Sequence, residues 1–195
     1  MNIAAIIFLL STTTPTIEPD EPPSYEELVE QATINCKNAR GKEIDVDLLW
    51  KLVEVEKQYS PAPEVRGMVL AAACSESGYN PKARGDHKFS KSGKKPKAIG
   101  ILQLWPIYKK MYPGLDRTNP VDSAHAWMKH IVKMLPKVKK QCRYKTPKRL
   151  WIAAWVTGIR YKKPGGRCKE RPKHLRILRR WHRNITKERA EPCGC

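Results

Sequence analysis

The chain has 195 residues, 41% of them hydrophobic, so it can bury the core of one ordinary domain and is not a disordered chain. Its formal net charge is +19, unevenly spread: residues 1–60 carry a net −6 and residues 61–195 a net +25. This excess of positive charge favours an anionic polymer as partner, and it leaves only eight acidic residues after residue 60 as candidates for acid chemistry.

The first segment, Ile3 to Leu10, is an apolar run of eight residues, which is too short to cross a bilayer as a helix. We expect residues 1–23 to form a leader, with an export signal followed by a linker rich in Thr, Pro and acids. No Lys or Arg precedes the run and no clear Ala-x-Ala site follows it. A short membrane-associating end or a packed terminus is therefore the alternative.

Two helices are expected next. Ser24 and Glu27 form a capping-box pattern, which predicts a helix that runs to about Asn38. Asp45 or Asp47 can cap a second helix, whose apolar residues recur at helical spacing. Both helices are expected to brace the core of the domain.

A third helix carries the best candidate acid. Pro63 suits its first turn, and an apolar stripe on one face leads to Glu76. Gly78 and the Asn80-Pro81 pair then end the helix. A carboxyl group at the end of a buried stripe is partly desolvated, which raises its pKa, so it can protonate a leaving oxygen near neutral pH. A solvated Glu in a surface turn is the alternative interpretation.

Residues 82–97 form a loop rich in lysine that contains Asp86. The loop is too polar to pack, and it predicts either a lid over a glycan or a solubilising surface loop, with a short β element possible.

A second apolar cluster follows from Gly100 to Pro106. Its Gln103 offers a donor and acceptors for sugar hydroxyl and acetamido groups, although a plain surface glutamine is the alternative.

Three further helices complete the pattern. One should run from Pro120 to about Lys140, another starts at Pro147, and an arginine-rich helix starts at Pro172. The arginine-rich helix could enter a DNA groove, but such charges more often form a solvated face. His125 and His130 do not share a helical face, so no metal site is expected from them.

The six cysteines permit a disulfide framework in an exported chain. We expect Cys142 to pair with Cys168, because the two bracket one helical hairpin, and Cys74 to pack as a small apolar residue. The Cys193-Gly194-Cys195 end lacks a matching second pair of metal ligands.

Four blocks of the sequence resemble the motifs of the soluble lytic transglycosylase family. Glu76–Ala83 resembles the block E-S-x-[FY]-[ND]-P-x-A, and Gly100–Pro106 resembles G-L-M-Q-[IV]-x-P. Asn119-Pro120 and the helix after it resemble the third block, and Ile152–Gly158 resembles A-A-Y-N-A-G. The blocks occur in the family's order, although Trp155 and Val156 replace its usual Tyr and Asn, so a core role is an alternative for Trp155.

The resemblance covers roughly residues 63–161 and implies a mainly α, lysozyme-like fold. With the N-terminal bracing helices we expect this domain over residues 24–185, followed by a Cys-containing tail over residues 186–195. It implies a lyase that cleaves the bond between N-acetylmuramic acid and N-acetylglucosamine in peptidoglycan, with Glu76 as acid and then base. No metal or organic cofactor is implied. The glycan-binding residues would be Ser77, Gly100, Ile101, Leu102, Gln103, Trp155 and Tyr161.

Two alternatives remain open. A hydrolysing muramidase of the same fold would use a second carboxylate, with Asp86 as the first candidate. A nucleic-acid-binding or structural protein would use the basic half of the chain, although no nucleic acid is expected as partner.

We expect a monomer that binds peptidoglycan strands and anionic cell-envelope polymers, either exported to the cell wall or carried in a phage virion. The compact size and high positive charge favour a bacteriophage over a bacterial source.

Overall fold

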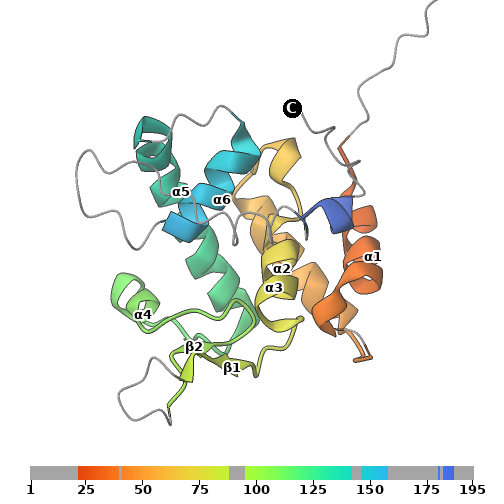
Figure 1. Cartoon of the computed structure of the whole chain (residues 1–195), viewed down its shortest axis with the longest axis horizontal. Coiled ribbons are helices and arrows are strands. Elements are labelled where there is room, and N and C mark those ends of the chain that lie inside the picture. Colours follow the sequence, from red (N-terminus) through yellow and green to blue (C-terminus); the bar gives the residue numbers. More distant parts are fainter. Residues whose placement is uncertain are drawn as a thin grey trace, which may run out of the picture.

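The computed structural model describes residues 22–39, 41–87, 95–141, 146–157, 180 and 182–186. The described part is mainly helical, which confirms the expected mainly α class (Figure 1). In chain order the elements are α1 (Tyr25–Asn35), η1 (Lys37–Ala39), α2 (Val46–Gln58), η2 (Pro63–Val65), α3 (Met68–Ser77), β1 (Arg84–Gly85), β2 (Ala98–Ile99), α4 (Ile107–Met111), α5 (Pro120–Gln141) and α6 (Pro147–Thr157).

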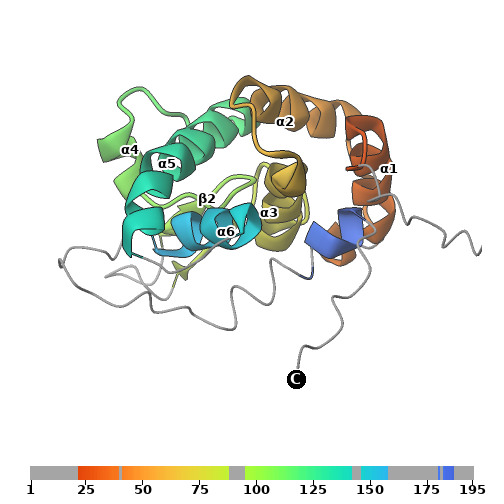
Figure 2. The same cartoon turned by 90° about the horizontal axis from the view of Figure 1, so that it is seen from above.

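Helix α3 lies in the middle of the molecule, within the arrangement formed by α1, α2, α5 and α6 (Figure 2). Every residue from Met68 to Cys74 is at most 2% exposed. The segment contains only apolar residues, and a helix that is apolar on all sides is stable where other helices cover it completely. The helix that carries Glu76 is therefore held by the core on every side.

The start of α3 differs from the prediction. Pro63 opens the short η2, which ends at Val65, and Gly67 adopts a left-handed conformation with φ of 75° before α3 begins at Met68. A non-glycine residue would strain this backbone, so Gly67 separates the two helical segments. The continuous helix expected from Pro63 is therefore wrong.

The first two helices begin where their local signals place them. Ser24 Oγ accepts a hydrogen bond from the Glu27 amide at 3.2 Å, and the Ser24 amide donates to Glu27 Oε2 at 2.9 Å, which confirms the capping box. Asp45 Oδ1 accepts from the Leu48 amide at 3.0 Å, so Asp45 rather than Asp47 caps α2. Helix α1 ends at Asn35, earlier than predicted, and the chain continues in η1.

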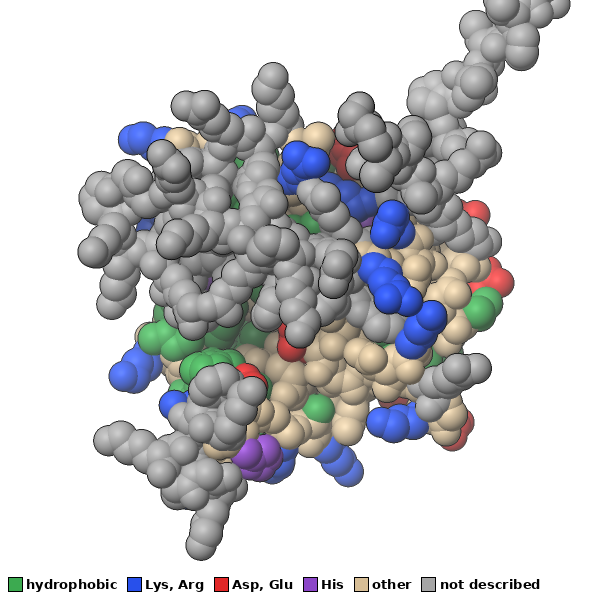
Figure 3. Space-filling model, viewed as in Figure 1, with side chains coloured by type: hydrophobic (Ala, Val, Ile, Leu, Met, Phe, Trp, Pro, Cys, Tyr) green, Lys and Arg blue, Asp and Glu red, His purple; other side chains and the backbone are tan. Residues whose placement is uncertain are grey.

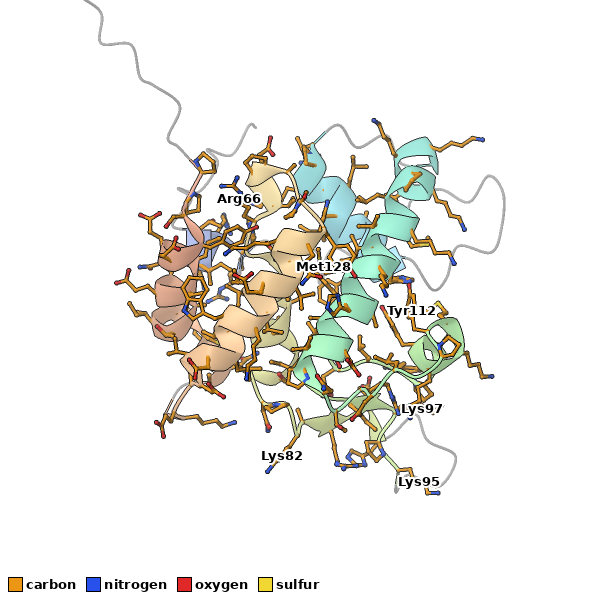
Figure 4. The ribbon with its side chains drawn as sticks, turned by 180° about the vertical axis from the view of Figure 1, so that it is seen from behind. Arg66, Lys82, Lys95, Lys97, Tyr112 and Met128 are labelled. Carbon is orange, nitrogen blue, oxygen red and sulfur yellow. A yellow bond between two sulfur atoms is a disulfide. The ribbon has the colours of Figure 1, made fainter. Side chains whose placement is uncertain are left out.

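A short antiparallel pair follows α3. Arg84 of β1 is opposite Ile99 of β2, and Gly85 is opposite Ala98, which confirms the expected β element near this loop. Figure 4 shows Lys82, Lys95 and Lys97 around this pair, at the edge of the molecule. Residues 88–94 of the basic loop are outside the described residues.

The described C-terminal residues return to α1. Residues 182–186 are helical, and Asn35 Nδ2 donates a hydrogen bond to the Asn184 carbonyl at 2.9 Å. His182 Nε2 lies 2.8 Å from the Arg66 carbonyl, so this helical turn also contacts the segment before α3.

Several predictions concern residues outside the described ranges. These are the leader, Cys142, Tyr161, Cys168, most of the arginine-rich helix and the C-terminal cysteine tail. Within the described ranges, no helix combines the length and apolar character needed to traverse a lipid bilayer.

Candidate active site

Glu76 lies in the last turn of α3, at the point where this helix leaves the core. Its side chain is exposed to solvent, yet burial raises the pKa of its carboxyl group to about 7, and the nearby charge of Asp86 raises it further. A group with this much exposed surface keeps part of its hydration, which limits the size of the shift. Glu76 is thus accessible to a ligand and holds a proton at higher pH than an ordinary glutamate.

The N-terminal end of α3 is fixed by a second glutamate. Glu56 of α2 is fully buried, and its carboxyl oxygens accept hydrogen bonds from the amides of Gly67 and Val69, at 2.6 and 2.8 Å. Burial raises the pKa of Glu56 to about 7, against the lowering effect of these two bonds. Glu56 supplies the cap that Gly67 lacks, and it therefore sets the position of the helix.

The C-terminal end of α3 is fixed by η1. Cys36 and Cys74 form a disulfide, which corrects the expectation that Cys74 packs as a free apolar residue. Asn38 Nδ2 donates to the carbonyls of Cys74 and Ser75 in the last turn of α3, both at 3.0 Å, and the Cys74 carbonyl also accepts from the Gly78 amide. Gly78 ends α3 with φ of 61° and lies directly against the Asn38 carbonyl, where a side chain would not fit.

Ser77 joins α3 to the turn that follows β2. Its hydroxyl lies 2.7 Å from the Ile101 carbonyl and 3.1 Å from the Ala73 carbonyl. The single hydroxyl proton is therefore directed at backbone acceptors, and the structure places Ser77 as a positioning residue between two segments. The resemblance names Ser77 as a glycan-binding residue, whereas both of these bonds are made to carbonyls of the protein itself.

The turn from Gly100 to Leu104 is tightly built. Gly100 has φ of 81° and lies against the Arg117 carbonyl, while Gln103 has φ of 48° and donates from Nε2 to the Gly100 carbonyl at 2.8 Å. The side chains of Ile101 and Leu102 are buried, so these two residues can meet a ligand only through their backbone. The half-buried Gln103 is the member of this turn whose side chain is partly accessible.

Asp86 lies close enough to Glu76 for its charge to raise the pKa of the Glu76 carboxyl group. Its Oδ2 accepts a hydrogen bond from the Trp105 indole N–H at 2.9 Å, which orients the carboxylate. Lys97 Nζ lies 5.6 Å from the centre of the Trp105 ring, a cation–π arrangement that holds the ring from the side of β2. The sequence placed Asp86 ten residues after Glu76, which gave no indication of this proximity.

Tyr108 belongs to the same group of side chains. It is 4% exposed, and burial is the first cause of its raised pKa, with the charges of Tyr112 and Glu76 as further causes. Its ring centre lies 5.3 Å from that of His130 on α5. The phenol therefore remains neutral and lies close enough to Glu76 for the two groups to interact.

Strained backbone gathers around Glu76. Four described non-glycine residues have positive φ, and three of them lie in the segments just described: Tyr79 (63°), Asp86 (56°) and Gln103 (48°). Each such residue costs on the order of 1 kcal/mol or more, and strain of this kind is often found at binding and catalytic sites. The concentration of three such residues in these segments is typical of a functional site rather than of an ordinary helix end.

Trp155 and Tyr161 are not placed in this group. Trp155 is half-buried on α6, and its ring meets the buried Trp127 ring edge-on at 5.8 Å between centres. This contact agrees with the core role that was the alternative for Trp155. Tyr161 lies outside the described residues.

Some residues of the site had no sequence signal of their own. Glu56 is not among the candidate acids, all of which follow residue 60, and the sequence indicates Asn38 only as the approximate end of the first helix. Arg117 donates from Nη1 to the carbonyls of Lys97 and Leu104, at 2.9 and 2.8 Å, and so holds both ends of the β2 turn. Among the described residues, no cluster of three His, Cys, Asp or Glu side chains is arranged to hold a metal ion.

Comparisons of the chain with protein-family models, with curated proteins and with solved structures find no match. Membership of the lytic transglycosylase family, which the four sequence blocks suggest, therefore stays a prediction.

Proposed function

We propose that this protein is a peptidoglycan lytic transglycosylase with a lysozyme-like domain, and that Glu76 is its catalytic acid and base. The observation that supports this most is the state of Glu76: a solvent-accessible carboxyl group whose pKa is raised to about 7 at the end of a buried helix. A general acid works best when its pKa is near the working pH, because it is then protonated and still able to give up the proton.

The proposed reaction needs one carboxyl group. Glu76 donates its proton to the glycosidic oxygen as the bond to C1 of N-acetylmuramic acid breaks and an oxocarbenium-like state develops. The Glu76 carboxylate then takes the proton of the C6 hydroxyl on the same sugar, and O6 bonds to C1 to close a 1,6-anhydro ring. Glu76 ends protonated again and no water is consumed.

The remaining residues position these groups. Ser77 keeps the Gly100–Leu104 turn against the end of α3 through its bond to the Ile101 carbonyl. Gln103 closes the turn internally through its bond to the Gly100 carbonyl. The glycan would lie along this turn and meet the accessible part of Gln103. The basic residues around β1 and β2 would favour a strand that carries carboxylates.

A hydrolysing muramidase is the second candidate, because Asp86 is close enough to Glu76 to raise its pKa. In an inverting hydrolase a second carboxylate activates a water on the opposite face of the sugar from the acid. Trp105 bonds to Asp86 Oδ2. In a hydrolase, Asp86 Oδ1 would be the oxygen that binds such a water.

Digestion of purified peptidoglycan separates the candidates. The wild type, Glu76→Gln, Asp86→Asn and the control Glu64→Gln would be compared, with products identified by mass spectrometry. Glu64 is an exposed acid in η2, which makes it a matched substitution away from the site.

The transglycosylase predicts 1,6-anhydro ends from wild type and from Glu64→Gln, none from Glu76→Gln, and the same products at an altered rate from Asp86→Asn. Reducing ends that disappear in both the Glu76 and the Asp86 variants would identify a hydrolase. Absence of any product that depends on Glu76 would reject both enzymes.

A further inference from the structure

A hollow of about 600 Å³, lined by no residue of the Glu76 group, lies between the end of α1, η1, the loop that leads to α2, and the C-terminal helical turn. The hydrogen bond from Asn35 to the Asn184 carbonyl holds that turn against α1, which brings Arg180 to the rim. A volume of this size is typical of sites for small ligands or for one or two units of a polymer.

Three positive side chains from three separate segments line the hollow. Lys37 comes from η1, Lys42 from the loop after it, and Arg180 from the C-terminal turn, and all three are exposed. No Asp or Glu is among the described residues of its lining. Like charges that line one hollow repel one another, so an anion bound among them offsets this repulsion and adds charge-assisted hydrogen bonds.

The molecular surface agrees with this distribution of charge. Figure 3 shows Lys and Arg side chains in a row on the side of the molecule where α1 and the C-terminal helical turn lie. An anionic chain that approaches this side of the molecule would therefore meet positive charge along its path.

The rest of the lining indicates what kind of anion fits. Thr33 and Asn184 add a hydroxyl and an amide group, which suit sugar hydroxyls, and Ile34 and Ile44 give an apolar wall. Positive side chains beside groups that can bond to sugar hydroxyls favour a saccharide that carries oxyanions.

We infer that this hollow is a binding site for phosphate or carboxylate groups on an acidic polysaccharide. Cys36 lines the hollow and is bonded to Cys74 in α3, so a bound polymer is held in a fixed relation to the end of the helix that carries Glu76. The site makes no use of Glu76 chemistry, and it would stand even if the chain had no glycan-cleaving activity.

The test compares two triple variants of the full chain that lower the net charge equally. The first is Lys37→Gln with Lys42→Gln and Arg180→Gln. The control is Lys129→Gln with Lys133→Gln and Lys137→Gln, three exposed lysines of α5, which Figures 1 and 2 place away from α1. Binding to sodium polyphosphate, to polygalacturonate and to a single-stranded DNA would be measured by calorimetry at physiological salt, with thermal unfolding to verify the folding of each variant.

We expect the first variant to lose on the order of tenfold or more in affinity for an acidic probe, and the control to change by about twofold or less. Loss for polyphosphate alone would assign phosphate as the ligand group, whereas loss for polygalacturonate alone would assign carboxylate. Equal losses in the two variants would show that only the overall charge attracts anions and would overturn the site. Tighter binding of DNA than of either other probe, lost in the first variant alone, would replace the saccharide with a nucleic acid. Failure of the wild type to bind any of the three probes would also overturn the proposed site.

Discussion

Cys36 at the end of α1 and Cys74 in α3 form a disulfide, with their Cα atoms 5.8 Å apart. The bond joins residues 38 positions apart in the chain and lies two residues before Glu76. Asn38 reinforces it by donating to the carbonyls of Cys74 and Ser75. The end of the helix that carries the candidate acid is therefore fixed covalently and by hydrogen bonds to the same segment.

Replacing both cysteines should destabilise the protein strongly. For a closed loop of 38 residues, the lost constraint on the unfolded chain corresponds to about 4 kcal/mol in the free energy of unfolding. Urea unfolding of Cys36→Ser/Cys74→Ser against wild type, both without reductant, measures this loss. Urea unfolding of the double variant with added reductant measures separately what the other four cysteines contribute to stability. A double variant as stable as wild type would contradict the bracing role of the disulfide.

Asp86→Asn should shift the pH dependence of glycan cleavage. A general acid is active while protonated, so the rate falls as pH rises through the Glu76 pKa of about 7. Asp86 is the second cause of that raised pKa, and removing its charge lowers the pKa, which moves the falling limb to lower pH. The substitution keeps an oxygen that can accept from Trp105. The measurement is kcat/KM against pH, with the exposed Asp47→Asn as a control that leaves the limb in place.

The stability of the fold should depend on pH through Glu56. Its pKa is raised from 4.5 to about 7 by burial, so the folded state holds this proton over a range in which the unfolded state has released it. The stability associated with the protonated group is complete below pH 4.5 and is lost as pH rises towards about 7, at up to about 1.4 kcal/mol per pH unit. Denaturant unfolding of wild type and Glu56→Gln at several pH values gives the difference attributable to Glu56. A difference that does not vary with pH would show that the carboxyl group keeps its ordinary pKa.

Gly100→Ala should cost more than Gly114→Ala, although the two glycines have nearly equal φ of 81° and 84°. A Cβ at Gly114 meets open space, so only the left-handed backbone is strained, which costs roughly 1 kcal/mol. A Cβ at Gly100 would overlap the Arg117 carbonyl, which adds about 1–3 kcal/mol and displaces the turn beside Glu76. Thermal unfolding and peptidoglycan digestion of both variants would measure the two effects. Equal stability of the variants would mean that the turn relaxes without cost.

Local sequence signals predicted the beginnings of several helices correctly. The Ser24 capping box, the acidic cap of α2 and Pro147 at the start of α6 each depend on residues within one turn of the helix, so a short stretch of chain is enough to specify them. The start of α3 was mispredicted because its cap, Glu56, comes from another helix and leaves no mark beside Gly67.

The sequence by itself determined that the chain is mainly helical and that Glu76 ends an apolar helix, because apolar periodicity and capping residues are local properties. Only the tertiary structure placed Asp86 beside Glu76, joined Cys36 to Cys74 and set Asn38 on the end of α3. These contacts depend on how the helices pack around α3. Packing brings together residues that are far apart in the chain, and their separation in the sequence does not reveal their distance in space. The chemistry proposed for Glu76 therefore rests on a residue that the sequence indicated and on surroundings that only folding assembles.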